Sequence, residues 1–152
     1  MLTLDELAAR FQTCTLPRAE WTHVAHLRVG AWHVHHFGAD GALGRMRAGI
    51  RALNDSHGTA NTDTGGYHET ITVAYVRLLD GFLSACNPAL SLEDRVRTLV
   101  DGPLADRAVL LRYWSKDLLM SPAARRAWVP PDLAPLAVPA DALVSARGRS
   151  PA

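Results

Sequence analysis

Cysteine is scarce in this chain, since Cys14 and Cys86 are the only two among 152 residues. Two thiols so far apart provide no dense disulfide framework, which argues against the small secreted folds that depend on several bridges. A reducing compartment is then the default, and we expect a cytoplasmic protein. The first residues, Met1 to Glu6, carry acidic side chains where a secretory signal would need Lys or Arg.

Long apolar runs and an excess of one charge are lacking as well. No apolar segment approaches the roughly 18 residues of a membrane-spanning helix, so we expect no membrane partner. The 16 basic and 15 acidic residues give a formal net charge of +1, which provides no electrostatic reason to expect nucleic acid as a partner. The length, with 48% hydrophobic residues, is typical of a single globular domain.

Helical periodicity runs through most of the chain. Thr3 and Glu6 form a capping box, and Gly38 and Gly58 are typical helix stops. No segment alternates with a period of two for long enough to predict a strand. The expected fold is all-α, a compact bundle of about six helices with a short extra helix, in one domain over residues 1–135. Apolar spacing predicts helices over residues 3–12, 21–37, 40–57, 67–86, 91–102, 104–120 and 121–128.

The C-terminal residues have a different composition. From about Asp132 onward the chain is mostly Ala, Pro, Ser and Arg with little pattern. We therefore expect residues 136–152 to form a flexible, frayed tail.

Three histidines occupy positions where a helical protein normally places Leu or Ile. His23 and His26 lie in the segment Trp21-Thr22-His23-Val24-Ala25-His26-Leu27, and His68 lies in Tyr67-His68-Glu69-Thr70. A buried imidazole needs a hydrogen bond, a ligand or a metal ion. If consecutive helices run antiparallel, these histidines, together with His57, meet at one end of the bundle.

This convergence leads to the main functional hypothesis, a metal-dependent enzyme that acts on a small molecule. His23 and His26 are three residues apart and share a helix face. With His68 they would supply three nitrogen ligands and leave an open position, the usual pattern of catalytic Zn²⁺. Fe²⁺ or Ni²⁺ would suit the same ligands. Glu69 would be the catalytic carboxylate, as ligand or general base, although it lies about 100° from His68 around the helix.

Three further residues are candidates for substrate binding. Thr72 and Tyr75 follow His68 on the same helical stripe and would line a pocket. Tyr75 would otherwise be a core residue with its hydroxyl hydrogen-bonded. Asn61 lies in the small polar loop 58–66, where it would either bind substrate or only shape turns.

Two alternatives belong to other functional classes. The first is a non-catalytic module whose histidines hold a small ligand or an anion. The second is an interaction subunit, in which Trp32 and the face of residues 33–36 meet a partner chain or a second copy in a homo-oligomer. The histidines would then be structural, with His23 and His68 hydrogen-bonding loop carbonyls at helix ends.

Several segments resemble a family of small uncharacterised bacterial helical proteins with WTHxxHL and YHET motifs. They are Leu16-Pro17 through Leu27, Gly66-Tyr67-His68-Glu69-Thr70, and Leu119-Met120-Ser121-Pro122. The resemblance extends over about residues 10–135. It implies a helical fold and no particular activity.

Overall fold

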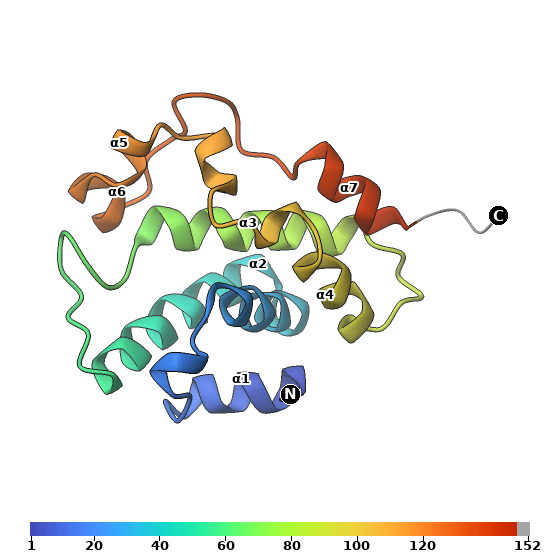
Figure 1. The fold of residues 1–152 in the computed structure, drawn as a ribbon, viewed down its shortest axis with the longest axis horizontal. Coiled ribbons are helices and arrows are strands. Elements are labelled where there is room, and N and C mark those ends of the chain that lie inside the picture. Colours follow the sequence, from blue (N-terminus) through green and yellow to red (C-terminus); the bar gives the residue numbers. More distant parts are fainter. Residues whose placement is uncertain (149–152) are drawn as a thin grey trace.

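The computed structural model describes residues 1–148, and the regular secondary structure of this part of the chain is all helical (Figure 1). Helix α3 runs through the middle, with α1 and α2 on one side and α5, α6 and α7 on the other (Figure 1). No helix within residues 1–148 is both long and apolar enough to cross a bilayer. The helices are α1 Leu4–Gln12, α2 His23–Ser56, α3 Glu69–Ala85, α4 Leu92–Val100, α5 Lys116–Leu119, α6 Pro122–Arg126 and α7 Ala140–Arg147, and the 3-10 turns are η1 Arg18–Glu20, η2 Pro103–Ala105 and η3 Val109–Arg112.

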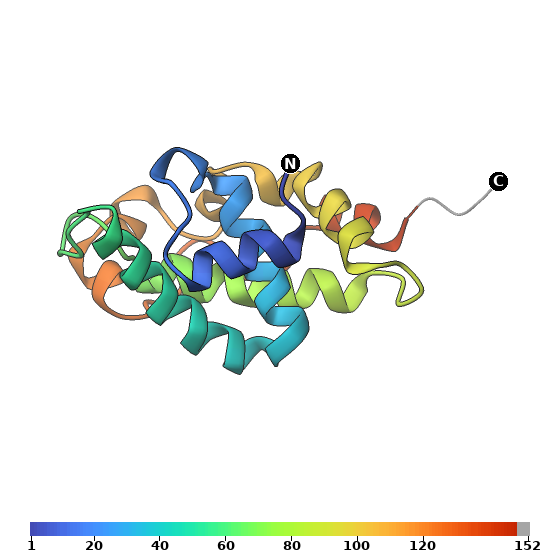
Figure 2. The same ribbon diagram turned by 90° about the horizontal axis from the view of Figure 1, so that it is seen from below.

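Helix α2 is sharply bent at Gly38. This residue has φ 72° and ψ 174°, a conformation that glycine adopts readily and residues with a Cβ rarely do. The bend divides α2 into two arms, residues 23–37 and 39–56, which diverge in Figure 2. The predicted break at Gly38 is therefore confirmed. The two arms do not form the antiparallel pair that we expected, because no loop separates them.

The main core lies where α2 packs on α3. A Cβ atom built on Gly30 of α2 would lie 2.7 Å from Leu79 Cδ1 of α3, so the absence of a side chain lets the two helices approach closely. Trp114 and Phe82 are fully buried beside this contact. A second cluster, around Phe11, lies under α1.

Residues 104–120 do not form the single helix that their periodicity predicts. They form η2, η3 and the short helix α5. The Asp106 carboxylate accepts a hydrogen bond from the Ala108 amide, and the Ser115 hydroxyl accepts one from the Leu118 amide. Such local side-chain acceptors compete with a continuous helix. The segment instead folds as an irregular cover over the core.

The expected flexible tail is ordered as far as residue 148. Helix α7 packs against α3 and α4, and its Ala142 and Ala146 are almost completely buried. The chain leading to α7 is fixed by the Tyr113 hydroxyl, which donates a hydrogen bond to the Ala137 carbonyl at 2.6 Å. Two alanines spaced i, i+4 form an apolar stripe too narrow to be conspicuous in the sequence. Residues 149–152 lie outside the described residues.

Candidate functional site

A cavity of about 410 Å³ lies between both arms of α2, helix α3 and the segment 107–120. The first arm of α2 contributes His23 and His26, and the second contributes Met46 and Ile50. This volume lies within the range of small-molecule sites. A second hollow, of about 640 Å³, is bordered by α1, α2 and α4 and includes none of the predicted site residues.

His23, the first residue of α2, is fixed at the cavity wall by a backbone contact. Its Nε2 donates a hydrogen bond to the Leu104 carbonyl at 3.3 Å. Burial lowers the pKa of His23, although the bond to Leu104 opposes this effect. The ring is therefore neutral at pH 7. Because its one N–H is used by Leu104, Nδ1 carries a lone pair and can only accept a hydrogen bond.

His26 is held one turn further along α2. Its Nδ1 donates to the Thr22 carbonyl at 2.7 Å, and its ring stacks on Trp21 with 3.6 Å between centroids. Burial lowers the pKa of His26 from 6.5 to about 4. Its Nε2 is consequently a second neutral acceptor on a ring that lines the cavity.

Tyr75 and Thr72 also line the cavity, as the sequence predicts. The Tyr75 ring lies edge-on to His23, with 5.4 Å between ring centroids. Burial raises the pKa of Tyr75 to about 12, so the phenol is protonated. Within residues 1–148 no group is hydrogen-bonded to its hydroxyl, and the Tyr75 side chain is part of the cavity lining. Thr72, in contrast, donates its hydroxyl to the His68 carbonyl at 2.8 Å.

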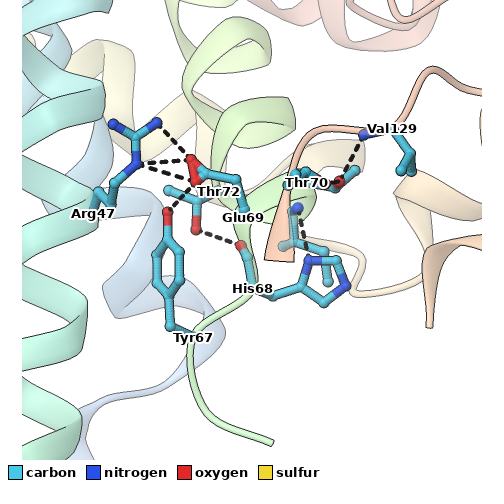
Figure 3. A network of polar contacts seen from close by, with 9 residues as sticks. Arg47, Tyr67, His68, Glu69, Thr70, Thr72 and Val129 are labelled. Carbon is cyan, nitrogen blue, oxygen red and sulfur yellow. Dashed lines mark hydrogen bonds and ion pairs between the residues drawn. The ribbon is translucent and has the colours of Figure 1, made fainter. Parts of the chain in front are cut away.

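His68 does not join His23 and His26. It is the N-cap of α3, and its Nδ1 accepts a hydrogen bond from the Ile71 amide at 3.1 Å (Figure 3). Its Nε2 donates to the Leu119 carbonyl at 2.7 Å. Both ring nitrogens are thus used, and metal binding would require both hydrogen bonds to break. Within residues 1–148 no three His, Cys, Asp or Glu side chains are grouped to hold a metal ion.

Glu69, the expected catalytic carboxylate, forms an ion pair away from the cavity lining (Figure 3). Arg47 Nε donates to Glu69 Oε1 at 2.8 Å, and the Tyr67 hydroxyl donates to Oε2 at 3.0 Å. Burial favours the protonated carboxyl, but the hydrogen bonds from Arg47 and Tyr67 outweigh it, and the pKa of Glu69 is lowered. A carboxylate saturated with donors and 8% exposed is a poor general base.

Asn61 has a structural role in the loop between α2 and α3. Its side-chain oxygen accepts hydrogen bonds from the Tyr67 amide and from the Asn54 side chain, both at 3.0 Å. It does not contribute to the cavity lining. Nor does His57, which donates Nε2 to the Leu16 carbonyl at 2.7 Å. Asn61 therefore fits its alternative role as a turn residue.

The face expected to meet a partner chain is partly covered by α1. The Trp32 indole N–H donates to the Asp5 carboxylate at 2.7 Å, and His33 is only 1% exposed. His35 and His36 remain exposed. Trp32 thus meets another helix of the same chain.

Two basic residues, Arg107 and Lys116, line the cavity and were not among the predicted site residues. Within the described part of the chain no Asp or Glu lines it. The sequence contains no motif that would identify these two residues. They lie in residues 104–120, a segment for which the prediction of a single helix is wrong. Comparisons of the chain with family models, with curated proteins and with solved structures returned no match.

Proposed function

We propose that this protein binds a small, largely apolar molecule in the cavity between α2, α3 and residues 107–120. The observation that carries this proposal is the combination of an apolar wall with three uncharged polar groups that have unused hydrogen-bonding capacity. These groups are His23 Nδ1, His26 Nε2 and the Tyr75 hydroxyl. Small-molecule sites are typically apolar with a few such convergent groups.

A binding module is better supported than a metal-dependent enzyme. The enzyme hypothesis needs His68 as a third ligand and Glu69 as base, and both side chains are engaged elsewhere. A Zn²⁺, Fe²⁺ or Ni²⁺ ion held by His23 and His26 alone would depend on the substrate or water for its other ligands. Such a site stays a prediction, to be tested by elemental analysis of the purified protein.

The proposal can be tested by filling the cavity. Ile50 is half-buried and lines it, whereas Ala48 lies two residues away on the same helix and is exposed. We expect decanol or 1-naphthol to bind the unchanged protein with a change in tryptophan fluorescence, because Trp21 lines the cavity. Ile50→Trp should weaken binding by about tenfold or more, and Ala48→Trp should leave it unchanged. Equal binding by both variants, or no binding of either probe, would refute the proposal.

A further inference from the structure

We propose that the natural ligand is an organic acid, whose apolar body fills the cavity and whose carboxylate lies against Arg107 and the Tyr75 hydroxyl. This inference rests on the proposed function, because it assigns the polar end of the ligand in the same cavity. It is carried by the charges on the cavity lining and by the unused Tyr75 donor.

The charges that line the cavity have one sign. Arg107 and Lys116 contribute to it, and no acidic residue within positions 1–148 does. Neither cation forms an ion pair with a carboxylate in this part of the chain. The acidic neighbours Asp106 and Asp117 adjoin them in sequence but lie off the lining, and both are exposed. A ligand that brings its own negative charge would therefore meet two cations at the wall.

Several polar side chains of the cavity lining adjoin or influence one another. The positive charge of Arg107 contributes to lowering the pKa of both His23 and His26, after the larger effect of burial, and the Tyr75 ring packs on His23. The charge of Asp106 acts on some of the same side chains, since it favours protonated His23 and the neutral Tyr75 phenol. Arg107 and Tyr75 line the same cavity, so a ligand that fills it can meet both the guanidinium and the phenol.

A carboxylate fits these donors better than an alcohol or an amine. The protonated Tyr75 hydroxyl and the Arg107 guanidinium would both donate to it, and hydrogen bonds to a charged group are the stronger kind. An ammonium group would be repelled by Arg107. An alcohol would gain hydrogen bonds from the imidazoles without the charge attraction. The carboxylate would also raise the pKa of His23, so that binding draws a proton onto Nδ1, which then donates as well.

The inference is tested with three probes that share one apolar chain: decanoate, decanol and decylamine. Titration calorimetry should show decanoate binding about tenfold more tightly than decanol, and decylamine more weakly than either. Arg107→Gln should weaken decanoate binding several-fold and leave decanol binding unchanged, whereas Tyr75→Phe should weaken decanoate binding more than decanol binding. Arg10→Gln is the matched control, because Arg10 is exposed on α1, away from the cavity.

Two measurements on the unchanged protein support the comparison of variants. Raising the ionic strength should weaken the binding of decanoate but not the binding of decanol. At pH 6 the protein should take up protons when decanoate binds. The binding heat measured by calorimetry should then depend on the ionisation enthalpy of the buffer. The organic-acid assignment is wrong if decanol binds as tightly as decanoate, or if Arg107→Gln leaves the ratio of the two dissociation constants unchanged. The proposed function stands in either case. If no probe binds, the proposed function itself fails.

Discussion

The His68 imidazole donates Nε2–H to the carbonyl of Leu119, 51 residues away, while its Nδ1 accepts the amide of Ile71 in the first turn of α3. His23 and His57 make contacts of the same kind, to the carbonyls of Leu104 and Leu16. In each case a ring N–H at the end of a helix donates to a main-chain carbonyl of another segment. These are the contacts expected if the histidines are structural.

Replacing His68 with alanine should destabilise the fold. The variant loses an N-cap, which contributes about 1 kcal/mol, and leaves the Leu119 carbonyl without its donor, which costs roughly 1–3 kcal/mol. The melting temperature should fall by roughly 5–10 °C. His68→Asn should recover part of the loss, because its side-chain oxygen can cap the Ile71 amide. If His68→Ala instead removes bound Zn²⁺, Fe²⁺ or Ni²⁺ and leaves the melting temperature unchanged, His68 is a metal ligand.

Replacing Glu69 with glutamine should also lower stability, through loss of the ion pair with Arg47. Glu69 is almost completely buried, but the Arg47 side chain is 39% exposed, so solvent weakens the pair. We expect a loss of about 2 kcal/mol at pH 7, below the value for a fully buried pair. The exposed pair of Arg97 with Asp94 is the control, and Asp94→Asn should change stability by less than about 1 kcal/mol.

The Glu69 pair also predicts an acid dependence. The pKa of Glu69 is lower in the folded protein than its ordinary value of 4.5. Its stabilising effect is therefore complete above pH 4.5 and is lost as the pH falls through the folded pKa. In urea titrations below pH 5, the difference between Glu69→Gln and the unchanged protein should shrink. A difference that stays constant down to pH 2 would contradict the lowered pKa.

The cavity histidines predict a loss of stability at mildly acidic pH. Burial lowers the pKa of His26 from 6.5 to about 4, so below pH 6.5 the unfolded chain binds a proton that the folded protein does not. Stability is then complete above pH 6.5 and declines towards pH 4, by on the order of 2 kcal/mol. His26→Phe should flatten this part of the pH profile, whereas replacement of the exposed His35, whose pKa is also lowered, should flatten it less. If the pH profile of His26→Phe is identical to that of the unchanged protein, His26 is not buried in its neutral form.

The order of the C-terminal segment can be tested with two arginine substitutions on α7. Ala142 is 1% exposed and Val144 is 70% exposed. Ala142→Arg would force a charge into the core beside α3 and α4 and should cost more than about 3 kcal/mol. Val144→Arg should be nearly neutral. Equal melting temperatures for the two variants would mean that the segment is not packed in solution.

The local signals in the sequence predicted the helix boundaries well. Thr3 caps α1 with the expected partner Glu6, and Gly38 breaks α2. Such signals act within a few residues and are therefore readable. Residues 104–120 were mispredicted because the caps at Asp106 and Ser115 prevail over an apolar periodicity that also fits a helix.

The candidate site was predicted only in part. Helical spacing correctly placed His23 and His26 on one face, and Thr72 and Tyr75 on another, and the structure brings both faces to one cavity. The spacing could not reveal that the Leu119 carbonyl would approach His68, since that contact depends on how an irregular segment crosses α3. The assumption of antiparallel helices also failed at Gly38.

The bend at Gly38 has a consequence for ligand size. Part of the cavity lining comes from the arm of α2 before the bend, and part comes from the arm after it. The breadth of the cavity thus depends in part on the backbone torsions of Gly38, which does not itself line the cavity. A side chain at position 38 would strain this geometry, and relief of the strain would change the angle between the two arms. A substitution at position 38 would thereby change which ligand widths fit the cavity without changing any residue of the cavity lining.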